Sequence, residues 1–252
     1  MNDSRSSDMQ SPHAVAGRLQ QVQRRIDDAC SRSGRSPADV AIIAITKRKS
    51  VDYVLAGVEA GLRHFGENRV EEASAKIPDV RARTPVPLTW HMVGHVQSRK
   101  AADVLGLFEL VHSLDSLKLA QRFSRLAQEQ GRTLDVLVQV NVSGEDTKSG
   151  LEAAHWSQRN AVRAALWQQM EQILALPGLR VRGLMTMAPI VDDMEQTRPL
   201  FAGLAALRDA LAQSLGVPLP ELSMGMTDDY PVAIEEGATM VRIGRAIFGE
   251  RD

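Results

Sequence analysis

The sequence predicts an α/β protein, a single (β/α)8 TIM barrel with an extra N-terminal helix. Eight short apolar runs of strand length alternate with helical patterns along nearly the whole chain. The segments between them are too short to be linkers between domains, and 252 residues is a usual size for one such barrel. An open, doubly wound sheet is the alternative. Against it, the first strand-to-helix turn lacks the G-x-G-x-x-G pattern, and no internal repeat divides the chain.

The first part of the chain predicts a tail and then the extra helix. Residues 1–11 are polar and rich in serine, so we expect a disordered tail before a barrel that spans 12–252. Apolar residues then recur three and four positions apart between Val15 and Ala29, which is the pattern of an amphipathic helix. Gly34 and Pro37 are expected to end that helix.

The eight predicted strands are short runs rich in Ile, Val and Leu. In chain order they cover 41–45, 63–66, 88–93, 110–113, 134–142, 181–187, 221–224 and 239–243. The first is a five-residue, Ile-rich run typical of a strand buried on both faces. The fifth is the longest, and it leads into a polar loop at 143–150 that contains two glycines and has no periodicity.

The predicted helices between these strands follow the 3.6-residue period and end at glycine or proline. They cover 51–58 before Gly61, 70–77 before Pro78, 99–104, 117–127, 155–176 before Pro177, 200–211 and 232–236, with Ile247 and Phe248 closing the chain. Strands and helices therefore alternate to the end of the sequence.

Composition excludes several kinds of partner. The 30 basic and 31 acidic residues nearly cancel, which gives no electrostatic reason to expect nucleic acid or an anionic membrane. No apolar run approaches the roughly 20 residues of a membrane span. The only cysteine, Cys30, cannot form an internal disulfide, in keeping with a reducing compartment. We expect a cytoplasmic protein.

Lys47 is the first candidate functional residue. It follows the first strand directly, and in parallel α/β folds the carboxyl ends of strands carry the chemistry. Burial at the barrel mouth beside Arg48 and Lys49 is expected to lower the pKa of its amine. A neutral amine can form a Schiff base with an aldehyde. The competing interpretation is an ordinary solvated lysine just past a strand.

Two loops near the C-terminus are candidates for a phosphate site. Ser223 to Thr227 supply two hydroxyls around Gly225, and Gly244 opens the final helix after the eighth strand. Barrels of this class commonly bind phosphate after strands seven and eight, although both loops could be ordinary glycine-containing turns. Arg242 interrupts an apolar strand, and alternation aims it into the barrel together with Met240. A cation that points into the barrel is expected to pair with an anion or to donate a hydrogen bond to a ring nitrogen.

A metal site is not expected. His91 and His95 are four apart, but the first lies on a strand, Gly94 intervenes and no third ligand follows. Packing or hydrogen bonding near the rim explains them better. We interpret His64 and His112 as satisfied core or rim residues.

Six stretches together resemble the pyridoxal phosphate homeostasis protein family (the YggS/PROSC family). They are AITKRK at 44–49, FGEN at 65–68, WHMVGHVQSRK at 90–100, VQVNVSGE at 138–145, LSMGMT at 222–227 and VRIGRAIFG at 241–249. The resemblance runs from about Leu19 to the C-terminus. It implies a barrel like the N-terminal domain of alanine racemase, with pyridoxal 5'-phosphate (PLP) as the cofactor.

The resemblance also assigns roles to particular residues. It implies that PLP is held as a Schiff base on Lys47, with Arg242 facing the pyridine nitrogen. Asn68 and Met224 would lie beside the ring. The phosphate contacts implied by the resemblance come from Ser223, Thr227, Gly244 and Arg245, the last two through backbone N–H groups.

Two positions depart from the family pattern. Arg245 stands where the family usually has Thr or Ser, so a hydroxyl contact to phosphate is lost while the backbone N–H remains. An arginine could compensate through its charge. Ser50 stands where the family usually has proline.

A carrier of PLP is favoured over an enzyme. Arg242 donates hydrogen bonds but cannot keep a proton on the pyridine nitrogen, which makes the ring a weaker electron sink. Racemases of this fold take a second acid or base from an additional C-terminal domain and a partner subunit, which a chain ending at Asp252 is expected to lack. Of the two tyrosines, Tyr230 follows the Ser223 loop and could reach the mouth, but on the same rim as the other candidate residues.

The prediction is therefore a non-catalytic protein that buffers PLP or delivers it to PLP-dependent apoenzymes. By resemblance to the family we expect a monomer. The alternative is an amino-acid racemase or decarboxylase of the same fold. A third hypothesis is a cofactor-free Schiff-base aldolase, but such an enzyme would not need Arg242 on a cofactor ring.

Overall fold

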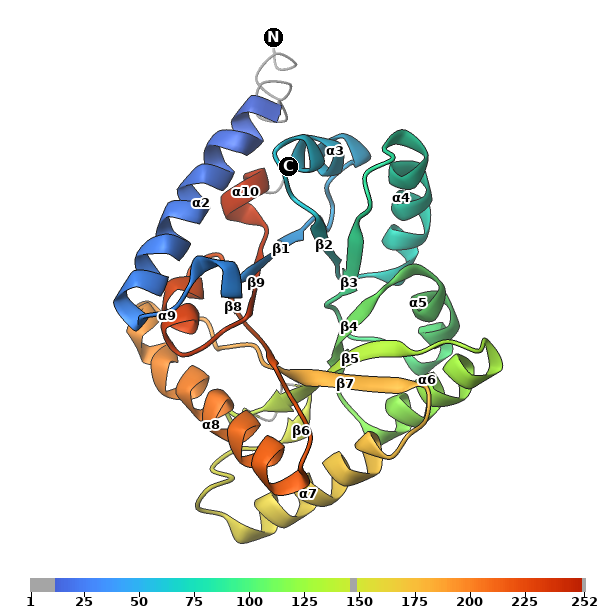
Figure 1. Cartoon of the computed structure of the whole chain (residues 1–252), viewed down its shortest axis with the longest axis vertical. Helices are drawn as coiled ribbons and strands as arrows, with labels where there is room; N and C mark the ends of the chain where they lie inside the picture. The colour runs from blue at the N-terminus through green and yellow to red at the C-terminus, as the bar shows by residue number, and fades with distance from the viewer. Residues whose placement is uncertain (1–11, 146–148, 251–252) are drawn as a thin grey trace.

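The computed structural model describes residues 12–145 and 149–250, and eight of the strands described there close into a parallel barrel. These strands are β1 (Ala41–Ile45), β2 (His64–Glu67), β3 (Thr89–Met92), β4 (Leu110–Leu114), β5 (Leu134–Asn141), β7 (Leu179–Met185), β8 (Glu221–Met226) and β9 (Met240–Ile243). Neighbours follow chain order, and the β1–β9 pairing closes the ring. Figure 1 shows the strands at the centre with helices around them. The predicted (β/α)8 barrel is confirmed.

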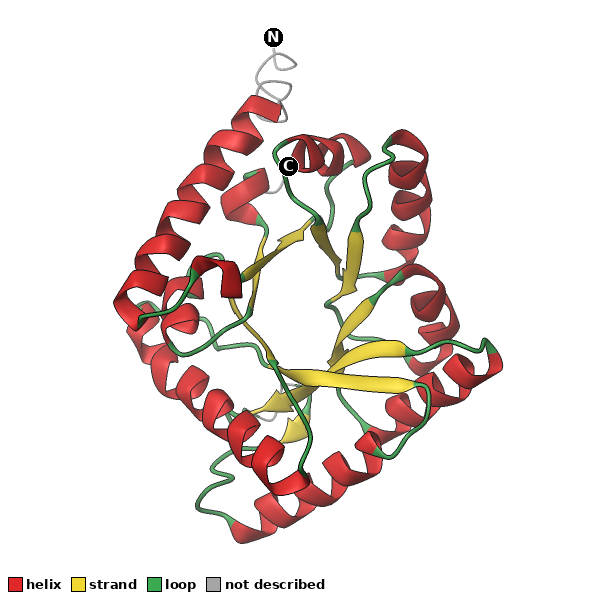
Figure 2. Ribbon diagram, viewed as in Figure 1, coloured by secondary structure: helices red, strands yellow, loops and turns green. Residues whose placement is uncertain are grey.

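The helices form the outer layer of the barrel (Figure 2). They are α2 (Pro12–Ser33), α3 (Val51–Glu59), α4 (Val70–Arg83), α5 (Ala101–Leu107), α6 (Leu117–Glu129), α7 (Asn160–Leu174), α8 (Arg198–Leu215), α9 (Tyr230–Glu235) and α10 (Arg245–Phe248). Short 3₁₀ turns η1 (Pro37–Asp39), η2 (Ser98–Lys100) and η3 (Met194–Thr197) precede β1, α5 and α8. Each long helix buries one apolar face, as the periodicity predicts.

The extra N-terminal helix α2 is part of the packed structure. Val15, Val22 and Ile26 are buried, and the helix packs against α9 and α10. Arg18 on α2 donates its Nε–H to the carbonyl of Ile247 at 2.6 Å. The first helix therefore holds the last ones in place, next to the loops that follow β8 and β9.

Two apolar clusters of different size make up the core. The larger one lies between the barrel wall and the helices. The smaller one contains Leu110, Leu137 and Met185, with Met240 packed against it. Leu110 and Met240 are the first residues of β4 and β9, so this second cluster lies toward the amino ends of those strands. On β9, Arg242 lies two residues nearer the carboxyl end than Met240.

The prediction that helix 70–77 ends at Pro78 is wrong. Helix α4 continues through Pro78 to Arg83. A proline in a helix removes one backbone hydrogen bond and costs about 3 kcal/mol. The turn beyond it is retained because Val80 is fully buried against the core, so tertiary packing outweighs the local preference.

The segment 143–176 also differs from the prediction. The expected helix at 155–176 begins only at Asn160, because His155 has a φ of 54°, a left-handed conformation that no helix continues through. A two-residue strand that was not predicted, β6 (Leu151–Glu152), pairs with β5 directly after the predicted polar loop. Other predicted ends shift by one to four residues, with the largest of these shifts at the C-terminal end of α8 (Arg198–Leu215).

Some sequence predictions fall outside the described part of the chain. The predicted tail at 1–11 lies there, and so do residues 146–148 and the last two residues of the predicted barrel. Among residues 12–145 and 149–250, no helix has both the length and the apolar character needed to cross a bilayer.

Candidate functional site

Lys47 lies in a tight turn directly after β1. The Thr46 N–H donates to the Gly66 carbonyl of β2 at 3.1 Å, and the Lys49 N–H donates back to the Thr46 carbonyl at 3.0 Å. Arg48 has a φ of 61°, which is uncommon for a residue other than glycine. Such a conformation persists when its surroundings hold it in place.

Helix α4 supplies the groups that hold this turn. The Glu72 carboxylate accepts the Arg48 backbone N–H, and Lys76 Nζ donates to the Thr46 carbonyl at 2.7 Å. Lys76 also pairs with Glu72 at 2.7 Å. The residues before and after Lys47 are therefore fixed by side chains one helical turn apart. Neither Glu72 nor Lys76 was predicted from the sequence to belong to the site, although their i, i+4 spacing is the available signal.

Glu67 at the end of β2 is the buried anion of this cluster. Its Oε1 accepts from Lys76 Nζ and from the Thr46 hydroxyl, each at 2.7 Å. The side chain is fully buried, and its Oε2 has no hydrogen-bond partner in the described structure. Burial raises the pKa of Glu67, while Lys76 and Thr46 act in the opposite direction.

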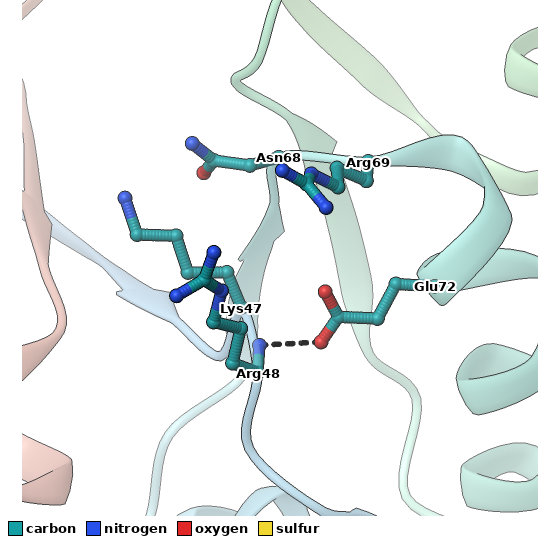
Figure 3. Close-up of a pocket in the computed structure, with 5 residues that line it drawn as sticks. All are labelled: Lys47, Arg48, Asn68, Arg69 and Glu72. Carbon is teal, nitrogen blue, oxygen red and sulfur yellow. Dashed lines mark hydrogen bonds between the residues drawn. The ribbon is translucent and has the colours of Figure 1, made fainter. Parts of the chain in front are cut away.

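A cavity of about 140 Å³ opens beside Lys47. Its lining residues are Lys47, Arg48, Asn68, Arg69 and Glu72. In Figure 3 the Lys47 side chain extends toward the Asn68 amide and away from the Glu72 carboxylate. Three cationic side chains against one carboxylate make this mouth suitable for an anionic ligand. The structure thus brings together two residues of the predicted site, Lys47 and Asn68.

Asn68 is held by close packing behind it. A Cβ on Gly94 would lie 2.1 Å from the Asn68 carbonyl oxygen, so only glycine fits there. This explains the glycine that follows β3. Any larger residue at position 94 would push Asn68 out of its place at the cavity.

The other predicted site residues follow the next two strands of the ring. The sheet order β2–β1–β9–β8 places Asn68, Lys47, Gly244 and Thr227 just beyond the carboxyl ends of four consecutive strands. The pairing of Ala44 with Ile243 sets β1 directly beside β9. The rim of the barrel therefore carries an amine, an amide, a hydroxyl and a glycine turn along one arc.

Gly244 and Arg245 differ in what they present to this arc. A Cβ on Gly244 would come within 3.2 Å of the Ile45 carbonyl, so the turn is tightly packed against β1. The Arg245 side chain is exposed and pairs with Asp228 at 2.5 Å and Glu250 at 3.5 Å. Its side-chain charge is paired with these two carboxylates, whereas the sequence suggested that this charge could compensate for a lost hydroxyl contact to phosphate.

Ser223 and Met224 both lie deeper than the rim. The Ser223 side chain is fully buried, and its Oγ bonds to Arg242 and His112. Met224 is fully buried in the main apolar core. The predicted phosphate contact of the Ser223 hydroxyl and the predicted ring contact of Met224 stay predictions.

Arg242 points into the barrel, as strand alternation predicts. Its Nη1 donates to Ser223 Oγ at 2.7 Å and its Nη2 to the Thr186 carbonyl at 2.9 Å. Burial lowers the pKa of Arg242 to about 10, while nearby Asp229 acts to raise it. The guanidinium is therefore charged at neutral pH. These two bonds account for two of its five N–H donors.

Three histidine side chains, each within hydrogen-bonding distance of the next, extend from Ser223 across the barrel. His112 Nδ1 lies 2.8 Å from Ser223 Oγ, and His112 Nε2 lies 2.9 Å from His91 Nδ1. His91 Nε2 in turn lies 3.0 Å from His64 Nδ1. The interpretation of His64 and His112 as satisfied histidines is confirmed. No sequence pattern indicated that they form a continuous series of hydrogen bonds with His91.

His95 is separated from this chain. Its imidazole is largely exposed and bonds to Asp115 at 2.8 Å, while His91 lies inside the barrel. No group of three or more His, Cys, Asp or Glu side chains in the described residues is placed to hold a metal ion. The predicted position of Tyr230 near the mouth is wrong, because its side chain is fully buried with its hydroxyl 3.5 Å from the Val22 carbonyl of α2.

The buried histidines predict that the protein loses stability in mild acid. Burial, followed by the charge of His64, lowers the pKa of His91 from 6.5 to about 3, and burial also lowers the pKa of His112. Below pH 6.5 these histidines are protonated in the unfolded chain but stay neutral in the folded chain, so the free energy of unfolding decreases as the pH falls. For His91 alone the expected loss by pH 5 is about 2 kcal/mol relative to pH 7.5.

Urea unfolding at pH 7.5, 6 and 5 checks this prediction. The raised pKa of Glu67 acts in the opposite direction, so the comparison is made between the wild type and His91→Asn. In His91→Asn the free energy of unfolding is expected to depend less steeply on pH than in the wild type. The control His13→Gln, which alters an exposed histidine, is expected to keep the pH dependence of the wild type. Equal slopes in the wild type and His91→Asn would contradict the assignment.

Comparison with known proteins identifies relatives of this chain. Residues 17–252 match the family model of the alanine racemase N-terminal domain. The chain is 40% identical over 234 residues to a pyridoxal phosphate homeostasis protein of Aquifex aeolicus, covering 93% of this chain and 97% of that protein. A protein of the same name from Pseudomonas aeruginosa is 40% identical over 238 residues, covering 94% and 96%.

A solved structure agrees with the sequence matches. PipY of Synechococcus elongatus PCC7942, determined with PLP bound, superimposes with a TM-score of 0.79 at 35% identity. The match covers 93% of this chain and all of PipY. The family-model match at 17–252 includes every rim residue described above.

Proposed function

The chain belongs to the pyridoxal phosphate homeostasis proteins, within the alanine racemase N-terminal-domain family, and from this premise we propose that it binds PLP and buffers or delivers it. We propose that residues 12–252 form the PLP-binding barrel. The observation that carries the proposal is the arc of Asn68, Lys47, Gly244 and Thr227 on four consecutive strand ends, with Arg242 buried below it.

The groups on this arc suit the chemistry of PLP. The Lys47 amine lines the cavity, where it would hold the PLP aldehyde as a Schiff base. Thr227 and the backbone N–H groups of Gly244 and Arg245 would hold the phosphate. When bound, PLP supplies an electrophilic carbon and an electron-withdrawing ring.

Arg242 sets what the site does with that ring. Its remaining N–H groups would donate to the pyridine nitrogen, and Ser223 would act on the ligand through Arg242. A guanidinium with a pKa of about 10 gives up its proton poorly, so the ring nitrogen is left unprotonated. This weakens the ring as an electron sink and favours storage of PLP over carbanion chemistry.

The buried tyrosines support the same choice. Racemization needs a second acid or base across the substrate from the lysine. Tyr53 and Tyr230 are both buried, so neither tyrosine of this chain reaches the mouth of the described barrel. We therefore propose no turnover of amino acids, in preference to a racemase or decarboxylase.

The setting follows from this role. We propose that the protein acts in the cytoplasm as a monomer and passes PLP to PLP-dependent apoenzymes. A rim made of loops, with Lys47 partly exposed, suits reversible loading.

Three measurements on the purified protein test this function. We expect a visible band when PLP is added, recovery of activity when the loaded protein is mixed with a PLP-free apoenzyme, and no change in single-enantiomer amino acids beyond that caused by free PLP. A colourless protein that takes up no PLP would refute binding. Turnover above free PLP would favour the racemase or decarboxylase.

A further inference from the structure

We infer that His64, His91, His112 and Ser223 form a one-way hydrogen-bond relay that runs through the barrel and positions Arg242. The relay is a property of the protein without ligand. Its effect on PLP binding rests on the proposed function. The four residues come from β2, β3, β4 and β8, and Arg242 from β9.

The direction of the relay is set by Arg242. A guanidinium only donates hydrogen bonds, so Ser223 Oγ is the acceptor of the Arg242 Nη1–H. The Ser223 hydroxyl hydrogen is then directed to its other neighbour, His112 Nδ1 at 2.8 Å. His112 Nδ1 must therefore be without a proton, and its Nε2 carries one.

The same logic fixes the next two histidines. His112 Nε2–H donates to His91 Nδ1, and His91 Nε2–H donates to His64 Nδ1. All three rings are neutral and protonated on Nε2. The reverse order would leave the buried Ser223 hydroxyl hydrogen without an acceptor among its neighbours in the described structure, which costs free energy in a barrel interior.

Burial keeps the imidazole rings of the relay neutral. His91 and His112 are at most 1% exposed, whereas His64 is half-buried at the first position of β2. The charged groups that face it are Arg242, which disfavours a proton on His112, and Asp229, which faces Arg242 in turn. A proton on His112 would break its bond from Ser223 and place a second cation beside Arg242.

The consequence for Arg242 is a fixed orientation. One bond ties its Nη1 to the relay and another ties its Nη2 to the Thr186 carbonyl, so the guanidinium cannot turn about either bond alone. Ser223 and His112 are thus positioning residues for the cation beneath the rim. In this role they act on the ligand through Arg242.

The first test is made on the wild-type protein without PLP. Long-range ¹⁵N–¹H correlation spectra of histidine-labelled protein distinguish the two tautomers and the charged ring. We expect His64, His91 and His112 as Nε2–H tautomers at pH 7, with His91 and His112 still neutral at pH 5. An Nδ1–H tautomer at His112, or a charged His112 or His91 at pH 5, would overturn the relay.

The second test uses two variants of Ser223. In Ser223→Ala the fixed tautomer of His112 is expected to be lost, and the Kd for PLP to rise about tenfold, as for loss of one hydrogen bond to a charged group. Ser223→Thr keeps the hydroxyl and is expected to restore both readings. Unchanged PLP affinity in Ser223→Ala would overturn the positioning role. Nε2–H tautomers in a wild type that fails to bind PLP would uphold the relay and refute the proposed function.

Discussion

In the Lys47→Ala variant, added PLP is expected to leave no borohydride-fixed label on the chain. Lys47 is the lysine that lines the cavity beside Asn68, and reduction converts a Schiff base into a stable bond that peptide mapping can locate. The wild type should carry its label on the peptide that contains Lys47. The visible band of the loaded protein should vanish in the variant as well.

Lys100→Ala is the matched control for this experiment. Lys100 is a partly exposed lysine next to the same rim, paired with Glu71 at 3.1 Å. This variant is expected to keep both the band and the label on Lys47. A label that persists in Lys47→Ala, on Lys49 or elsewhere, would remove the assignment of the Schiff base.

Lys76→Met is expected to lower the free energy of unfolding by about 3–5 kcal/mol, because it leaves a buried carboxylate without its counterion. Lys76 and Glu67 are both buried and joined at 2.7 Å. Lys76 also donates to the Thr46 carbonyl, so the turn that carries Lys47 loses a support. Urea unfolding measures the first effect, and PLP affinity the second.

The double variant Glu67→Gln/Lys76→Met separates charge from packing. Removing both charges is expected to recover most of the loss, since no unpaired ion is left in the interior. Lys100→Met, which breaks an exposed pair with Glu71, should change stability little. Equal stability of Lys76→Met and the wild type would show that Glu67 is held without Lys76.

The sequence identified two of the cationic site residues because each has a local signature. Lys47 follows an apolar strand, and Arg242 interrupts a strand whose alternation fixes its direction, whereas the role of Asn68 came only from the family resemblance. These features depend on a few neighbouring positions, so they could be recognised without the fold. The same is true of the eight strands and of the extra helix.

Residues that support the rim have no such signature. Lys76 serves Lys47 from 29 positions away through the Thr46 carbonyl, and in the sequence it is one charged residue on a helix among many. Helix α4 also shows the limit of local rules, because buried Val80 keeps it intact beyond Pro78. Only contacts between distant segments reveal such effects.

What the sequence determined by itself is the barrel, its order of strands and the cationic residues at its mouth, because periodicity and strand ends are written in consecutive residues. What only the tertiary structure decided is which side chains form hydrogen bonds inside the barrel. His64, His91 and His112 stand on three strands, and Ser223 is 111 positions beyond His112. The pairing of β2, β3 and β4 sets the three histidines side by side, and closure of the barrel brings Ser223 of β8 across to His112.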